Sequence, residues 1–351
     1  MRRIRLVALV WAATVVAFHP TAEAGPGPGW GAGVCTDQPL CAAIRDAARP
    51  RVPVVPAPSK DRSQPLPPQP ATEPPPEPPG PSAGEHLADR PSRSLARERR
   101  ELGVGGSITG RKTRGFVAFT FDDGPDDTTT PIVLDALERH RVPATFFVVG
   151  HRFTGRGKVA ARNRAVLEDI VARGHDIGNH TYRHHDLTTV PLNVAVKDFK
   201  KNARAIEKSL GHRPYLFRAP YGRLPGTVSS AARRAGYTVA KWNIDLKDFR
   251  NRPDLAQRAV SAIESKGGGI VLLHDTKPWT ARAVDDMLTQ LEALNCQRLS
   301  SGDEPIVPTT LHHVLADEAR RPVPAYVASR AARYLLYLSS ICQFDKPAQA
   351  P

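Results

Sequence analysis

Two neighbouring carboxylates, Asp122 and Asp123, follow an apolar run, Phe116 to Phe119, within the hexapeptide Thr120-Phe121-Asp122-Asp123-Gly124-Pro125. Like charges this close repel each other, so one of them needs a nearby cation or a shifted pKa. One Asp that binds a metal and one that handles protons would satisfy this requirement. The alternative is a solvated turn, because Asp, Gly and Pro are common turn residues. The hexapeptide alone does not decide between the two.

Two imidazoles, His180 and His184, stand four residues apart. On a helical turn this spacing aims both rings at one point, and imidazole suits zinc and neighbouring transition metals. Together with Asp123 they supply three protein ligands and leave positions open for water and substrate, which is typical of a catalytic metal site. The alternative is a His-rich surface, since His175 and His185 lie close by.

Alternating apolar strands and helices surround these residues. Strands are predicted at 116–121, 144–149, 175–178, 215–217, 237–244 and 269–273, and helices at 130–141, 165–173, 192–210, 227–235, 254–266 and 281–294. Near-continuous apolar strands alternating with helices indicate an α/β fold with a parallel sheet.

Ionisable residues recur where the predicted strands end. They are Asp122 with Asp123, His180, Arg218, Asp245 with Asp248, and His274. Side chains at the carboxyl ends of parallel strands converge on one site in barrels and in open α/β sheets. Convergence from five strands favours an active site over a set of turns.

At this point the chain resembles the NodB-homology polysaccharide deacetylases, carbohydrate esterase family 4, over about residues 115–315. Five family motifs match in order: Thr120 to Pro125, His180 to His184, Arg218-Ala219-Pro220-Tyr221, Asp245-Leu246-Lys247-Asp248-Phe249, and Leu273-His274. The resemblance implies a distorted (β/α) barrel with fewer strands than the eight-stranded form.

The resemblance also implies a role for each matched position in the first three motifs. Asp123, His180 and His184 would hold one divalent metal, zinc first, with cobalt or nickel tolerated. Asp122 would be the base that takes a proton from the attacking water, and Arg218 would pair with Asp122 and orient it.

The same resemblance assigns the remaining groups of the reaction. His274 would be the acid for the leaving amine, with Asp248 orienting it, and the backbone N–H of Tyr221 would stabilise the oxyanion. The expected substrate-binding residues are Pro220, Tyr221, Phe249 and Trp242. Trp242 and Trp279 could line a sugar subsite or be core aromatics, which is the commoner case.

Two positions depart from the family pattern: His185 stands where Pro is frequent, and Phe249 where Trp is frequent. Neither is an expected ligand or proton-transfer group, so an active enzyme is expected. It would remove N-acetyl groups from GlcNAc-type residues, with peptidoglycan favoured, then chitin or an exopolysaccharide. The rival hypotheses are an O-acetyl esterase acting on xylan-like glycans and a non-catalytic glycan-binding protein.

The first residues have the pattern of a cleavable signal peptide. Arg2, Arg3 and Arg5 precede the apolar run Leu6 to Phe18, and Ala22-Glu23-Ala24 supplies a small-x-small cleavage site. The run is shorter than the roughly 20 residues that span a bilayer. The mature protein is therefore expected to be secreted, periplasmic or in the cell envelope, with no membrane span after cleavage.

Export makes disulfides the default for the four cysteines, because the compartment is oxidising. Three pairings are possible among Cys35, Cys41, Cys296 and Cys342. The simplest is Cys35 with Cys41 and Cys296 with Cys342, since a Pro-rich spacer separates the two pairs. No pair has the CxxC spacing of a zinc cluster.

The formal net charge of +14 favours anionic partners, such as an anionic cell-envelope surface. No nucleic-acid motif is present, so nucleic acid is not expected as a partner. The expected partner is an acetylated polysaccharide substrate, and the protein is expected to be a monomer.

Composition divides the chain into five segments. Residues 50–81 hold 14 of the 34 prolines, a composition that is typical of a polyproline-type spacer without a packed core. We expect a signal peptide at 1–24, a short Cys-containing segment at 25–49, a disordered Pro-rich and charged linker at 50–112, a catalytic domain at 113–318 and a C-terminal helical extension at 319–351.

Overall fold

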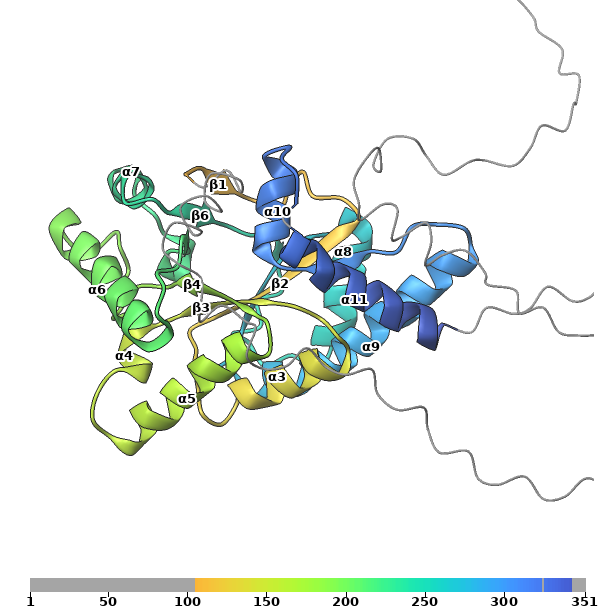
Figure 1. The fold of residues 1–351 in the computed structure, drawn as a ribbon, viewed down its shortest axis with the longest axis horizontal. Coiled ribbons are helices and arrows are strands. Elements are labelled where there is room, and N and C mark those ends of the chain that lie inside the picture. The colour runs from red at the N-terminus through yellow and green to blue at the C-terminus, as the bar shows by residue number, and fades with distance from the viewer. Residues whose placement is uncertain (1–104, 324, 343–351) are drawn as a thin grey trace, which may run out of the picture. The chain divides into compact units, whose positions relative to one another are not determined.

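The computed structural model describes residues 105–323 and 325–342. The predicted signal peptide, the Pro-rich segment 50–81, Cys35 and Cys41 lie outside these residues. Figure 1 shows the described strands and helices. The strands are β1 Ser107–Ile108, β2 Phe116–Asp122, β3 Thr145–Val148, β4 Asp176–Asn179, β5 Leu216–Phe217, β6 Thr238–Ala240, β7 Ile244–Asp245, β8 Gly269–His274 and β9 Val307–Thr309.

The strand pairs among the described residues are parallel, as the sequence predicts. The strand order is β1-β6-β5-β4-β3-β2-β8-β7, and β9 pairs with β2 in addition. β6 lies next to one edge strand while β7 is the other edge strand, yet only residues 241–243 connect them. Four Cα steps span at most about 15 Å, so the two edges must face each other. The sheet is therefore a curled, distorted barrel, as expected.

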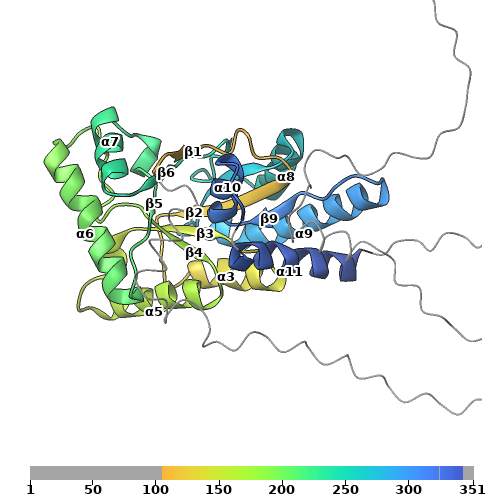
Figure 2. The ribbon, with the colours of Figure 1, turned by 45° about the horizontal axis from the view of Figure 1, so that its top comes forward.

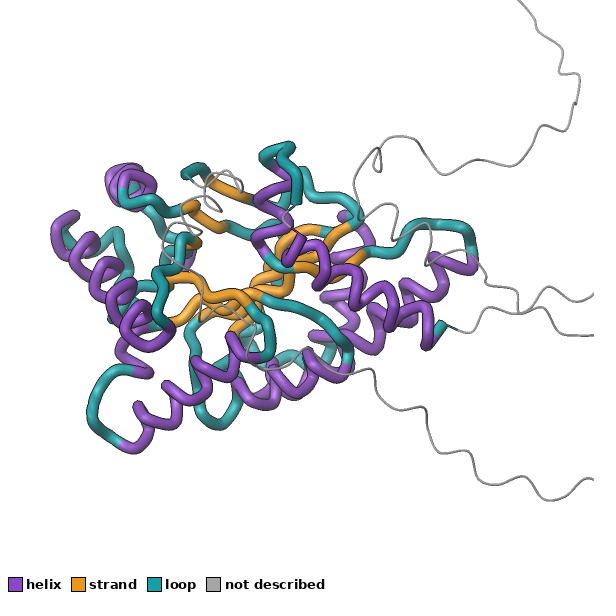
Figure 3. Tube along the Cα trace, viewed as in Figure 1, coloured by secondary structure: helices purple, strands orange, loops and turns teal. Residues whose placement is uncertain are grey.

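Helices surround the strands, which occupy the middle of Figure 3. They are α3 Thr130–Arg139, α4 Gly150–Phe153, α5 Lys158–Ala172, α6 Leu192–Leu210, α7 Gly226–Arg234, α8 Leu255–Lys266, α9 Pro278–Ser300, α10 Leu311–Glu318 and α11 Ala325–Ile341, with a short 3₁₀ turn at Pro220–Gly222. None of these helices is both long and apolar enough to cross a bilayer.

Strand β2 shows how the sequence places the site. Side chains alternate between the two faces of a strand. Phe119 and Phe121 belong to the large core cluster that includes apolar side chains of α3 and α9. Ala118 belongs to a second cluster, with Leu311 and other residues of α10. Asp122 shares the Ala118 face, so the alternation points it into the barrel.

Several predicted boundaries are wrong. The strand predicted at 237–244 is two strands, β6 and β7, because the chain passes from one edge region of the curled sheet to the other at 241–243. α5 and α9 are longer than predicted. β1 lies within the linker predicted at 50–112 and pairs with β6, so the sheet begins before residue 113.

Helix α11 lies in the predicted C-terminal extension and packs beside α9 in the views of Figures 1 and 2. The predicted disulfide between Cys296 and Cys342 is present and links α9 to the residue that follows α11. Arg330 of α11 donates a hydrogen bond of 2.7 Å to Asp176 of β4. The extension is therefore covalently and electrostatically attached to the barrel.

Candidate active site

The predicted site residues meet at one end of the barrel because the strands are parallel and in register. Asp122 of β2 is the direct partner of His274 on β8. His180 follows β4 and Arg218 follows β5, where Asn179 and Phe217 are partners. The carboxyl ends of four strands thus bring these side chains together.

Asp123, His180 and His184 form a group that could hold a metal ion, with one ligand atom of each within 4.8 Å of the others. Oδ1 of Asp123 lies 3.0 Å from Nε2 of His184 and 3.5 Å from Nε2 of His180. This buried oxygen has no hydrogen bond of acceptable geometry within the described residues. A carboxylate oxygen and two imidazole nitrogens facing one point form the donor set of a zinc-type site.

The tautomer of His180 strengthens this fit. Its Nδ1 lies 2.9 Å from the backbone oxygen of Arg218, which can only accept, so Nδ1 donates. In the neutral ring Nε2 then carries a lone pair, facing the Asp123 carboxylate. Two electron-rich atoms in this position need a positive charge between or on them. Fixing the ring through its other nitrogen is also how metal-binding histidines are oriented.

The pKa shifts of Asp123 and His180 indicate a site that attracts positive charge. Burial raises the pKa of Asp123, but His180 and His184 outweigh burial and hold it well below its usual range. Burial lowers the pKa of His180, but Asp122 and Asp123 outweigh it and raise that pKa. The surroundings therefore favour anionic oxygens and bound cations.

Residues 180–184 form a loop rather than a helical turn, with positive φ at Thr181 and His184. The loop is fixed by hydrogen bonds instead. The side-chain oxygen of Asp198, on α6, accepts bonds of 3.1 and 3.0 Å from the backbone N–H groups of Tyr182 and Arg183. Sequence spacing gave no signal for Asp198, which lies 14 residues beyond His184.

Asp122 and Arg218 form an ion pair buried inside the barrel, with Nη1 to Oδ1 at 2.8 Å. Arg218 is only 1% exposed. Its Nη1 also donates to Oγ1 of Thr120 at 2.7 Å, and its guanidinium lies 4.1 Å from the ring centre of Phe147. Oδ1 of Asp122 is thereby occupied, and Oδ2, 3.8 Å from His180 Nε2, faces the metal-ligand group.

His274 and Asp248 form the second polarised pair. Nδ1 of His274 lies 2.7 Å from Oδ1 of Asp248, whose Oδ2 accepts from the His274 backbone N–H at 2.7 Å and from Thr280 at 2.9 Å. Burial lowers the pKa of His274, but the hydrogen bond and charge of Asp248 outweigh it, and the pKa rises to about 9. His274 is therefore an imidazolium at neutral pH.

Aromatic side chains border the site. The exposed ring of Tyr221 lies 4.7 Å, centre to centre, from that of His184. Trp242 lies 5.5 Å from the Arg218 guanidinium and packs close to Gly222. Phe249, next to Asp248, is half exposed, whereas Pro220 is buried.

Some residues take positions that the sequence left open. Asp245 accepts from the side chain of Lys247 at 2.6 Å and from its backbone N–H at 3.1 Å, so it forms a turn. Trp279 donates to the backbone oxygen of Asp248 at 2.6 Å. Thr120 and Thr280, partners of Arg218 and Asp248, were not predicted, since threonine at these points carries no pattern of its own.

Comparisons with known proteins agree with this geometry. Residues 109–240 match the family model described as polysaccharide deacetylase. The peptidoglycan-N-acetylglucosamine deacetylase PgdA of Listeria monocytogenes is 33% identical over 184 residues, which cover 52% of this chain and 37% of the Listeria protein. This chain thus matches only about a third of that relative's length.

Two further relatives are matched over most of their length. A peptidoglycan-N-acetylglucosamine deacetylase of Bacillus cereus is 33% identical over 202 residues, 55% of this chain and 91% of that protein. The structure of the chitin deacetylase from the fungal pathogen Colletotrichum lindemuthianum is similar with a TM-score of 0.50 and 29% identity, covering 60% of this chain and 92% of that one.

Proposed function

The chain belongs to the polysaccharide deacetylase family, and we propose that it removes N-acetyl groups from GlcNAc-type residues of a glycan, with peptidoglycan as the favoured substrate. The observation that carries the proposal is a base and an acid polarised in opposite senses beside one metal-ligand group. Asp122 is paired with a buried cation, and His274 is paired with a buried anion. Such opposed environments are typical of acid–base assignments in active sites.

Asp123, His180 and His184 would hold the divalent metal, which we propose to be zinc, with cobalt or nickel as substitutes. A cation held there would supply Lewis-acid chemistry: it would lower the pKa of a water towards neutrality and polarise the acetyl carbonyl.

Asp122 is proposed as the general base. Arg218 binds Oδ1 and leaves Oδ2 to take the proton of the attacking water. Because Arg218 also binds Thr120, the guanidinium is fixed from two sides, and the carboxylate is oriented before the substrate arrives. Such preorganised charge lowers the barrier without reorganisation during the reaction.

His274 is proposed as the general acid. Its Nδ1 is bound to Asp248, so Nε2 is the nitrogen that delivers a proton to the leaving amine. An amine is a poor leaving group and needs that proton. A pKa of about 9 keeps this proton in place through the neutral range.

The remaining contacts are proposed to hold the sugar and the oxyanion. The backbone of Tyr221 adopts positive φ at 57° in the turn beside His184, and its N–H is the proposed oxyanion donor. Pro220, Phe249 and Trp242, with the Tyr221 ring, would line the substrate cleft.

An exported location fits the Cys296–Cys342 disulfide, because such bonds persist in oxidising compartments. We propose that the predicted signal peptide delivers the protein to the cell envelope or beyond.

The test is acetate release from a panel of acetylated glycans, with and without a chelator. Peptidoglycan and GlcNAc oligomers should release acetate, and chelation should abolish the release. Acetate from acetylated xylan alone would assign an O-acetyl esterase. Glycan binding with no acetate from any substrate would assign a non-catalytic binding protein.

A further inference from the structure

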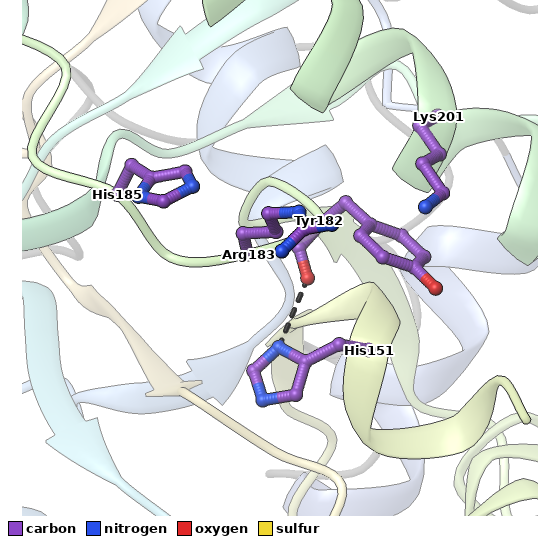
Figure 4. Close-up of a pocket in the computed structure, with 5 residues that line it drawn as sticks. All are labelled: His151, Tyr182, Arg183, His185 and Lys201. Carbon is purple, nitrogen blue, oxygen red and sulfur yellow. Dashed lines mark hydrogen bonds between the residues drawn. The ribbon is translucent and has the colours of Figure 1, made fainter. Parts of the chain in front are cut away.

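A cavity, here called the basic pocket, includes residues that are sequence neighbours of the proposed metal ligand His184, and Figure 4 shows its lining side chains. It measures about 430 Å³, a size typical of small-ligand sites. Its lining residues are His151, Tyr182, Arg183, His185 and Lys201. They come from three segments: α4, the loop that follows β4, and α6.

Two of the lining residues are covalent neighbours of a proposed metal ligand. Arg183 and His185 flank His184, so their Cα atoms lie about 3.8 Å from that of a proposed metal ligand. The pocket and two of the proposed metal ligands, His180 and His184, therefore share one short loop.

The lining carries permanent positive charge and no carboxylate. Arg183 and Lys201 are exposed, and no ion pair to either is found among the described residues. The nearest acids along these segments already have hydrogen-bond or ion-pair partners. Asp198 accepts two backbone N–H groups, and Asp186 pairs with Arg223 at 2.6 Å.

The pocket is also preorganised. His151 donates from Nδ1 to the backbone oxygen of Tyr182 at 3.0 Å, the bond drawn in Figure 4, which leaves Nε2 for another partner. The Lys201 ammonium lies 3.6 Å above the Tyr182 ring, and the Tyr182 hydroxyl is 2.7 Å from Oγ1 of Thr154. The aromatic ring therefore holds a cation at the pocket wall.

We propose that the basic pocket binds a carboxylate carried by the sugar unit next to the one that is deacetylated. This inference rests on the proposed function, and it names the substrate class: glycan strands whose sugar units carry free carboxylates, as peptide-free peptidoglycan strands do, are preferred over neutral chitin. Arg183 and Lys201 supply the charge, and the two imidazoles supply further hydrogen-bond donors or acceptors. Neutral oligomers offer these cations no anionic partner.

The experiment compares kcat/KM on three matched substrates of equal length. These are GlcNAc oligomers, peptide-free peptidoglycan strands, and the same strands with their carboxylates converted to methylamides. Peptide-bearing strands form a fourth arm, which separates a carboxylate on the sugar from one on the stem peptide. The wild type should prefer the free-carboxylate strands, and added salt should reduce this preference.

The double variant Arg183→Gln/Lys201→Gln should lower the ratio of acidic to neutral kcat/KM about fivefold to tenfold, as expected for two partly exposed charge pairs. The matched control is Arg204→Gln/Lys208→Gln, which removes the same charge from exposed positions of α6 outside the pocket lining. It should keep the wild-type ratio. Because a ratio is measured, a general loss of activity near His184 does not mimic the effect.

An unchanged ratio in the double variant, or equal turnover of methylamidated and free strands, overturns the inference and leaves the deacetylase proposal standing. Calorimetric binding of both strand types to chelator-treated protein gives a readout without hydrolysis. A preference for the free carboxylate there, lost in the double variant, supports the pocket even where no acetate is released. Equal binding of both strands contradicts it.

Discussion

The substitution Asp248→Asn should move the alkaline limb of the pH–activity profile to lower pH. Asp248 is the main group that raises the pKa of His274 from 6.5 to about 9, against the effect of burial. That difference corresponds to about 3 kcal/mol in favour of the imidazolium. With the carboxylate replaced by an amide, burial still lowers the pKa while Asp122 and Asp123 still raise it, and the pKa should fall to about 6.5.

The assay is kcat for acetate release between pH 5 and 10, with circular dichroism to confirm folding. The alkaline limb of the profile should move to lower pH by about two units or more. About a tenth or less of His274 should stay protonated at pH 7.5. The matched control is Asp245→Asn, the same change three residues away, where the carboxylate pairs with Lys247. An alkaline limb that stays in place in Asp248→Asn would refute the role of His274 as the acid.

The other predictions concern stability. Arg218→Met should lower the free energy of unfolding by about 3–5 kcal/mol, because Asp122 is left buried without its partner, and denaturant titration showing no loss would contradict this. Replacing Cys296 and Cys342 by Ser should lower the free energy of unfolding by about 2–4 kcal/mol, since the disulfide closes a loop across 46 residues. An unchanged melting temperature would contradict this prediction. In the metal-free protein, folding raises the pKa of His274, so this residue should add stability that is fully present below pH 6.5 and lost as the pH rises through about 9. Constant stability across that range would contradict the shift.

Strand-end chemistry was the predictable part of the site. An apolar run followed by an ionisable residue identifies a strand and its carboxyl end, and parallel pairing then brings such residues together. This reasoning is local, so it applied to Asp122, Arg218 and His274 without knowledge of the whole fold.

Features that depend on distant contacts were not predictable. The conformation of the 180–184 loop is fixed by hydrogen bonds from its backbone to Asp198 on α6, and the spacing of its two histidines does not reveal this. The split of 237–244 into β6 and β7 follows from barrel curvature. Thr280 reaches Asp248 across 32 residues, a contact that no sequence pattern marks.

The measurement that tests the central claim most directly is the stoichiometry of free amine and acetate released from GlcNAc oligomers. Wild-type protein loaded with zinc should release both in equal amounts. Asp122→Asn should lower kcat by about 10²–10⁴-fold, and His180→Ala should abolish zinc-dependent activity. Full activity in both variants, or acetate without free amine, would contradict the assignment of these strand ends as an amide-hydrolysing site.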